Sequence, residues 1–197
     1  MSLATLVLER GTQFVRIFDP DAAYRWSTPR YDYLGAVRGG RFDHQLAVDR
    51  GRTATWYASE DLTVAVIELL HHYRSLAKVR TLHAVAGYLA EPATVLDLRG
   101  VAGPSGGPPL AADPDRARTQ RRARELWGQH REAQGLFWRS RLVPSSTGTA
   151  FVLNERYFAH KGKPVRAFQG YPKRLTHPAL ESSVYAAWWL WHSSGEP

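Results

Sequence analysis

The chain contains no cysteine among its 197 residues. Disulfide bonds and thiolate metal sites are therefore excluded, and any covalent catalysis must use a nucleophile other than a thiol. Long apolar segments are also lacking, because the apolar run at residues 184–191 is far shorter than the about 20 residues of a membrane helix. Residues 1–9 have neither the basic start nor the apolar stretch of a signal peptide, so we expect a cytoplasmic protein without a membrane anchor.

Several common motifs of catalysis are missing as well. The glycine-rich segment 103–107 lacks the lysine and the strand-to-helix setting of a phosphate-binding loop, and no Gly-x-Ser-x-Gly sequence marks a serine hydrolase. His71 and His72 are adjacent, so on a helix their side chains diverge, unlike two metal ligands one turn apart. We assign no metal site.

The composition is that of an ordinary globular protein, with 44% hydrophobic and 22% charged residues, and the length fits a single domain over residues 1–197. The formal net charge of +8 favours polyanionic partners or ligands rich in phosphate. Much of the excess lies in six arginines between residues 116 and 131, in a helix predicted to begin after Asp113-Pro114. This segment is either a solvated helix face or a contact surface.

Strand-like and helix-like segments alternate irregularly, which predicts an α+β fold with a mostly antiparallel central sheet and flanking helices. A helix is predicted from an N-cap at Ser59 to about Arg74, and the apolar run at 184–191 is expected to be another packed helix. Residues 99–113 form a loop rich in glycine and proline, interpreted as a lid or a plain crossing. The predicted strands are residues 12–18, 53–58, 76–85, 94–98, 137–143 and 149–153.

Glu68 is the most informative residue, because apolar residues precede and follow it within its predicted helix. A carboxylate in that setting either forms a structural ion pair or reaches into a cavity, and both readings stay open from the residues alone.

Three other residues are candidates for a site. Arg16 lies between two apolar residues of a predicted strand and faces either a ligand or solvent. Arg41 follows two glycines, which permit a close backbone approach. Tyr57 lies at the junction between a strand and the helix that bears Glu68, where it is either a pocket residue or a core tyrosine.

Taken together and in order, these residues resemble the RES domain, the toxin half of bacterial toxin–antitoxin pairs, named for its arginine, glutamate and serine. The resemblance covers residues 12–175, with a tail at 176–197. It rests on Val15-Arg16-Ile17, Gly39-Gly40-Arg41-Phe42-Asp43, Trp56-Tyr57-Ala58-Ser59, Glu68 and the segment Gly135 to Ser140. Weaker matches are Val95-Leu96-Asp97-Leu98, Asn154 and Lys173-Arg174-Leu175.

The sequence also departs from the family pattern. Phe42 and Asp43 stand where tryptophan and asparagine are usual, and Ser140 follows Arg139 in place of the common proline. The stretch 44–55 is longer than expected and lacks a Pro-Gly pair. These departures affect the predicted shape of the pocket more than its charges.

The resemblance implies a fold similar to ADP-ribosyltransferases and an enzyme that consumes NAD by hydrolysis or phosphorolysis at the bond to nicotinamide, with inorganic phosphate as co-substrate in the second case. On this basis Glu68 stabilises the positive charge of the ribose, and Arg16 and Arg41 bind the pyrophosphate or an incoming phosphate. Tyr57 encloses the nicotinamide, and Ser140 hydrogen-bonds the ribose or the amide. Glu68, Arg41 and Ser140 are the predicted catalytic residues.

The resemblance further implies a cognate antitoxin, DNA-binding and Xre-like, that closes the pocket. The assembly state, a homodimer or a hetero-oligomer with the antitoxin, stays open. An ADP-ribosyltransferase acting on a protein or small molecule is the alternative function. A nucleic-acid-binding module built on the basic helix is a weaker one, because it leaves Glu68 and the Gly-Gly-Arg segment unexplained.

Overall fold

In a computed structural model of the chain, the residues described are 3–21, 27, 42, 55–101, 110, 115–140, 143, 148–159 and 164–193. Within them, nine strands form one curled sheet. The strands are β1 Thr5–Leu8, β2 Gln13–Phe18, β3 Thr55–Ser59, β4 His83–Leu89, β5 Ala93–Asp97, β6 Gly135–Arg139, β7 Thr149–Asn154, β8 Val165–Ala167 and β9 Lys173–Arg174.

The strand order is β1-β5-β6-β7-β3-β2-β4-β8, with β9 also paired to β4. All pairs are antiparallel except β5 and β6, whose parallel pairing requires a crossover connection. The helix α4, Arg116–Gln129, lies within that crossover. The predicted α+β class with a mostly antiparallel sheet is confirmed.

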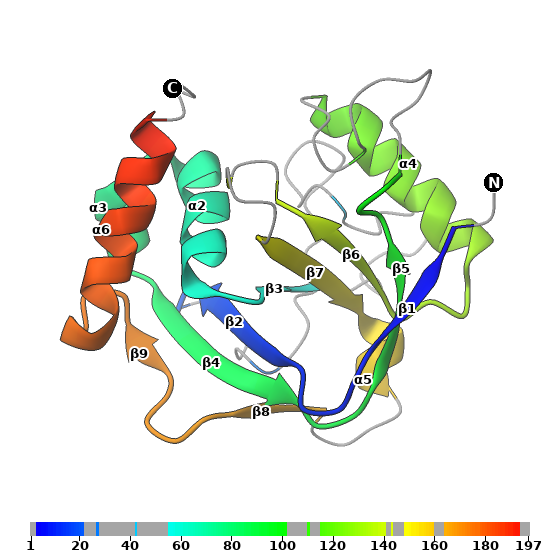
Figure 1. Ribbon diagram of the computed structural model, residues 1–197, viewed down its shortest axis with the longest axis horizontal. Coiled ribbons are helices and arrows are strands. Elements are labelled where there is room, and N and C mark those ends of the chain that lie inside the picture. Colours follow the sequence, from blue (N-terminus) through cyan, green and yellow to red (C-terminus); the bar gives the residue numbers. More distant parts are fainter. Residues whose placement is uncertain are drawn as a thin grey trace.

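Helices cover the sheet in two separate groups (Figure 1). The helices α2, α3 and α6 lie together at the left of the view, and α4 lies at the right. The bounds are α2 Leu62–Tyr73, α3 Leu76–Arg80, α5 Glu155–Ala159 and α6 Pro178–Ser193.

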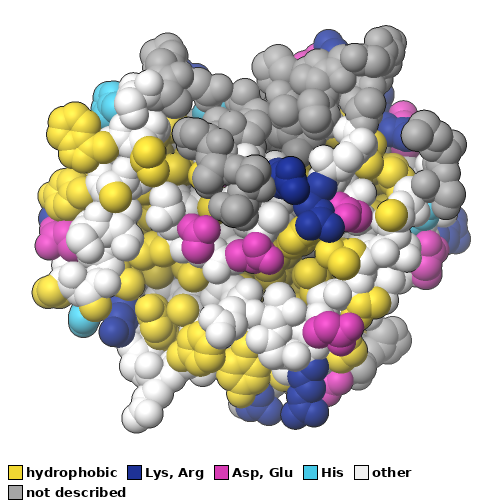
Figure 2. Space-filling model, in the orientation of Figure 1, with side chains coloured by type: hydrophobic (Ala, Val, Ile, Leu, Met, Phe, Trp, Pro, Cys, Tyr) yellow, Lys and Arg dark blue, Asp and Glu magenta, His cyan; other side chains and the backbone are white. Residues whose placement is uncertain are grey.

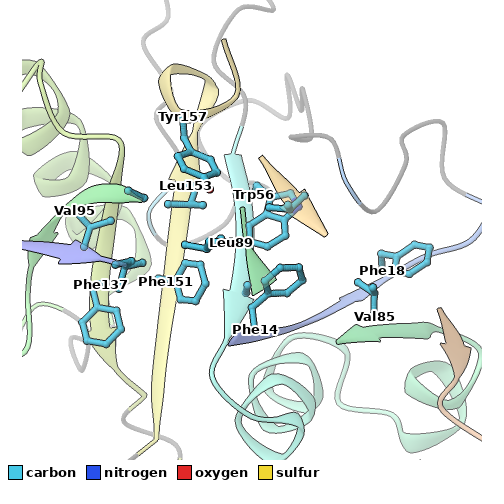
Figure 3. Packing of buried hydrophobic residues seen from close by; sticks show 14 residues of the cluster. Phe14, Phe18, Trp56, Val85, Leu89, Val95, Phe137, Phe151, Leu153 and Tyr157 are labelled. Carbon is cyan, nitrogen blue, oxygen red and sulfur yellow. The ribbon is translucent and has the colours of Figure 1, made fainter. Parts of the chain in front are cut away.

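The alternation of side chains along the strands divides the core between the two faces of the sheet. Every residue of β7 is buried: Phe151 and Leu153 join one cluster, while Ala150 and Val152 join another with residues of α4. Figure 3 shows the first cluster, in which the rings of Phe14 and Trp56 meet edge to face with centroids 4.9 Å apart. A sheet covered in this way holds the ends of its central strands in fixed positions.

A third cluster joins α2 to α6. Ile67 and Leu70 of α2 pack with Val184 and Trp191 of α6, and all four side chains are buried. Because Glu68 lies between Ile67 and Leu70 on the same helix, the packing of α6 determines where Glu68 is held.

Two predicted element boundaries are wrong. Ser59 does not cap α2, because it belongs to β3 and pairs with Val15 and Ala150; the cap is Asp61, whose carboxylate accepts a hydrogen bond from Val64 N at 2.9 Å. The cap of α4 is Asp115, which accepts from Arg118 N, whereas Asp113 and Pro114 lie outside the described residues.

The predicted strand at residues 76–85 is wrong over residues 76–82. Ser75 caps the short helix α3 by accepting from Lys78 N at 3.3 Å, and β4 begins only at His83. The strand predicted at residues 137–143 ends earlier in the structure, because β6 stops at Arg139. The loop at 99–113 lies almost wholly outside the described residues, as does the segment 28–41.

Candidate active site

Glu68 and Ser140 meet although 72 positions separate them in the sequence. The Ser140 hydroxyl donates a hydrogen bond of 2.6 Å to Glu68 Oε1. That length is typical of a hydroxyl bound to an ionised carboxylate, which makes stronger bonds than a neutral acceptor. The glutamate is half-buried, so its carboxylate lies at the edge of the core next to a fixed donor.

Ser140 is held by the sheet and not by a flexible loop. It directly follows β6, its backbone N–H donates to the carbonyl of Gly148 at 2.8 Å, and only 5% of the residue is exposed. Glu68 is fixed by the buried residues on either side of it in α2. The hydrogen bond therefore joins two rigid elements, which is how precise sites are built.

Tyr57 packs against residues that are close in sequence to both members of this pair. Its ring is half-buried in the cluster that contains Val64 and Trp138, and it meets the Trp138 ring edge to face with centroids 6.2 Å apart. Val64 is one helical turn before Glu68, and Trp138 lies in β6 two residues before Ser140. Val64 and Trp138 thus connect Tyr57 to the segments that carry Glu68 and Ser140.

Arg16 is inside the protein and does not face solvent, with only 5% of the residue exposed. Its guanidinium lies 5.0 Å from the centroid of the Trp56 ring and donates to the backbone carbonyl of Tyr57 at 3.2 Å. Strands β2 and β3 share a single register pair, Val15 with Ser59. Arg16 therefore connects two strands that are only briefly paired, directly behind the tyrosine.

Arg41 lies outside the described residues, but its neighbour Phe42 is described. The Phe42 side chain is fully buried, and its ring packs on Trp138 with centroids 4.5 Å apart. The Phe42 N–H donates to the Tyr57 hydroxyl at 3.0 Å, and its carbonyl accepts from Trp127 Nε1 at 3.2 Å. The Gly-Gly-Arg-Phe segment thus meets the site at its last residue.

Comparison with known proteins gives the family. The model of the RES domain matches residues 13–172, which is well over half of the chain. The chain belongs to the RES domain family. Its fold is similar to that of the MbcT toxin in the crystal structure of the M. tuberculosis MbcT–MbcA toxin–antitoxin complex, with a TM-score of 0.54 and 19% identity over 91% of this chain and 92% of that one. A search of curated proteins found no match.

The resemblance seen in the sequence is therefore confirmed for the family and for the fold. Of the predicted site residues, the structure joins Ser140 to Glu68 and Arg16 to the backbone of Tyr57 by hydrogen bonds, and the Arg16 side chain lies over Trp56. Within the described residues, no group of three or more His, Asp or Glu side chains is arranged to hold a metal ion. No helix in the described part of the chain is long and apolar enough to cross a membrane.

Trp127 is a residue that the sequence analysis missed. It is fully buried, and it contacts Phe42 from 85 positions away. The sequence offered one signal, a tryptophan at the apolar end of an otherwise basic helix. A single tryptophan more often marks plain core packing than a site, so that signal was too weak to use.

A group of charged residues lies where the central strands of this RES domain end. Asp97 accepts hydrogen bonds from Arg99, and these bonds lower the pKa of its carboxyl. Glu60 has a raised pKa because partial burial disfavours its charge, while nearby Arg99 opposes that effect; the Thr149 hydroxyl donates to its carboxylate. Arg99 thus lies near two carboxylates, and it favours the charged form of both.

The basic helix α4 is amphipathic. Ala123, Leu126 and Trp127 are buried, whereas Arg118 and Arg121 are exposed. Arg122 pairs with Glu125 at 2.6 Å, so part of the positive charge is balanced within the helix. On the face drawn in Figure 2, basic side chains likewise lie among acidic and apolar ones. This mixture fits a solvated helix face better than a nucleic-acid-binding surface.

Proposed function

We propose that this RES domain is the toxin of a toxin–antitoxin pair and that it depletes NAD by cleaving the bond between nicotinamide and ribose. The observation that carries the proposal is the 2.6 Å hydrogen bond between Ser140 and Glu68, with Tyr57 packed in the cluster that contains Val64 and Trp138. A carboxylate fixed by a donor, next to an aromatic ring, is suited to a substrate that is an aromatic cation joined to a sugar.

In the proposed reaction the bond between C1″ of the nicotinamide ribose and the ring nitrogen of nicotinamide breaks. Both electrons of that bond leave with nicotinamide, which becomes neutral. Positive charge then develops on the ribose, as in the cleavage of glycosides. The Glu68 carboxylate stabilises that charge, and the effect is largest at the transition state because the charge is greatest there. Water or inorganic phosphate attacks C1″ and loses a proton, which gives ADP-ribose or ADP-ribose 1″-phosphate.

Ser140 has two parts in this proposal. Its hydroxyl hydrogen is donated to Glu68, which orients the carboxylate. A hydroxyl oxygen also has lone pairs that accept hydrogen bonds, so Ser140 can accept from a ribose hydroxyl at the same time. The ribose, the serine and the glutamate would then form one chain of hydrogen bonds.

Tyr57 is proposed to enclose the nicotinamide ring, and Arg16 and Arg41 to bind the pyrophosphate or the attacking phosphate. In the structure the Arg16 guanidinium lies over the Trp56 ring and donates to the Tyr57 backbone carbonyl, so binding of the substrate by Arg16 would have to occur beside that backbone. The low exposure of Arg16 also favours a part in holding β3.

The proposed partner is an Xre-like, DNA-binding antitoxin that shuts the site. Support comes from the fold neighbour, whose structure is that of a toxin–antitoxin complex. Two surfaces are candidates for the contact: the basic face of α4 and the outer face of α6, where Trp189 is 70% exposed. A toxin that consumes NAD acts where NAD is, so the proposed location is the cytoplasm.

The test follows free nicotinamide by chromatography after purified full-length protein is mixed with NAD, with and without phosphate. Wild type is expected to release nicotinamide, and Glu68→Gln is expected to release none while keeping its fold by circular dichroism. The matched control is Glu181→Gln. Glu181 lies on α6 and pairs with Arg80 of α3, so this change should leave turnover unchanged.

The products distinguish the possible acceptors. ADP-ribose 1″-phosphate formed only with phosphate identifies a phosphorylase, and ADP-ribose in both conditions identifies a glycohydrolase. Labelled NAD that leaves its label on a macromolecule identifies an ADP-ribosyltransferase. A folded Glu68→Gln variant with wild-type turnover would remove Glu68 from the mechanism.

A further inference from the structure

Both backbone polar groups of Phe42 are bound by side chains from distant parts of the fold. Its N–H donates to the Tyr57 hydroxyl at 3.0 Å, and its carbonyl accepts from Trp127 Nε1 at 3.2 Å. Tyr57 is on β3 and Trp127 is on α4. A single residue thus links the helix in the crossover to a proposed substrate-binding residue.

The link is buried and geometrically constrained. Phe42 and Trp127 are fully buried, and the Phe42 ring lies against Trp138, which also contacts the Tyr57 ring. A buried carbonyl that loses its hydrogen-bond donor still has the desolvation free energy of burial, but no longer the hydrogen bond that offset it. Phe42 is therefore expected to move if Trp127 no longer donates to it.

Tyr57 is held at both of its ends. Its backbone carbonyl accepts from Arg16, and its hydroxyl accepts from Phe42 N. The orientation of the ring between these two points depends on Phe42 staying in place, and so on Trp127. The contact between Ser140 and Glu68 uses neither of these bonds.

We propose that Trp127 is a positioning residue for the active site: its indole N–H holds Phe42, and Phe42 fixes the hydroxyl of Tyr57. The expected effect of this anchor on NAD binding rests on the proposed function. Arg41 lies outside the described residues, but it is joined to Phe42 by a peptide bond, so the same anchor is one residue from a second proposed ligand of the substrate.

The predicted effect is on substrate binding more than on the chemical step. Trp127→Phe keeps an aromatic ring and removes the Nε1 donor. The KM for NAD should rise by about 3- to 10-fold, the worth of one ordinary hydrogen bond, while kcat stays within about twofold. The matched control is Trp188→Phe on α6, which removes an indole N–H from a half-buried ring packed on Trp191 and His192.

A double-mutant cycle tests whether Trp127 acts through Tyr57. If both side chains act on the same residue, Tyr57→Phe and Trp127→Phe should raise KM less in combination than the product of their separate effects. Effects that multiply fully would show that Trp127 acts by another route and would overturn the inference.

An activity-independent measurement is the hydrogen exchange of the Phe42 amide, followed by NMR. Trp127→Phe should accelerate exchange at Phe42, and Trp188→Phe should not. Unchanged KM and unchanged exchange in Trp127→Phe, or equal changes in both tryptophan variants, would overturn the inference. A wild type that releases no nicotinamide would instead refute the proposed function, and the exchange at Phe42 would still decide whether Trp127 holds that residue.

Discussion

Ser140→Ala removes the donor to Glu68 and, in the proposed complex, the acceptor for a ribose hydroxyl. The serine is almost fully buried at the end of β6, so alanine fills most of the same space and creates only a small cavity. The backbone bond from Ser140 N to Gly148 does not depend on the side chain. The variant should therefore fold, while Glu68 loses the hydroxyl that orients its carboxylate.

The size of the effect follows from the strength of the bond. A hydrogen bond to a charged group contributes about 1.5–3 kcal/mol, and the half-buried position of Glu68 lets water replace part of it, so we take the lower half of that range. A loss of about 1.5–2 kcal/mol from the transition state lowers kcat by about 10- to 30-fold. Stability should fall by less, because water solvates the carboxylate in both the folded and the unfolded protein.

The assay is the initial rate of nicotinamide release at saturating NAD, beside thermal unfolding of each protein. The matched control is Ser75→Ala, which deletes the cap of α3 and should cost about 1 kcal/mol of stability without lowering kcat. If Ser140→Ala keeps the wild-type kcat, Ser140 does not orient the catalytic carboxylate. If Ser75→Ala loses as much activity, the loss reflects stability and not the site.

Two further predictions concern the fold. Gly135→Ala should lower the free energy of unfolding by about 1–3 kcal/mol in urea titrations, because its Cβ would lie 2.6 Å from the Val152 carbonyl oxygen. Gly128→Ala on α4 should raise the free energy of unfolding by about 0.5–1 kcal/mol, because its Cβ would meet open space. The reversed order of stabilities would contradict the packing. Since Arg99 lowers the pKa of Asp97, the stabilisation from that carboxylate is complete above its ordinary pKa and is lost as pH falls below about 4. The stability difference between wild type and Asp97→Asn should thus shrink from pH 7 to pH 3, and a difference independent of pH would exclude this ion pair as its source.

The strands that form the centre of the sheet could be predicted from the sequence because their side chains are typical of buried strands. Residues 12–18, 94–98 and 149–153 are predicted within one or two residues of β2, β5 and β7. The cap of α2 could not be predicted, since Ser59 and Asp61 are both suitable caps and the pairing of Ser59 with Ala150 decides between them. That pairing involves residues more than 90 positions apart.

The strand β1 was not predicted at all. It is four residues long, and it exists because Thr5–Leu8 pairs with Ala93–Leu96 of β5. The strand predicted at residues 76–85 failed for the opposite reason, because the local cap at Ser75 favours one helical turn over an otherwise strand-like sequence. Short elements depend on one cap or one neighbour, and composition does not reveal which of these prevails.

The candidate site shows the same division. Glu68 and Ser140 were identified by motif, and the hydrogen bond between them was not, because it spans 72 positions. The anchor from Trp127 to Phe42 spans 85 positions and involves a backbone carbonyl, which has no signature in the sequence.

The packing of α6 against α2 has a consequence for how the protein is made. The helix that bears Glu68 ends at Tyr73, whereas the buried side chains that support it come from Leu180 to Trp191. At a synthesis rate of 5–20 residues per second, about 5–25 s separate the emergence of these two helices from the ribosome. During that interval α2 lacks the partner that holds Glu68 in place, so the proposed catalytic carboxylate is expected to reach its final position only after α6 has docked.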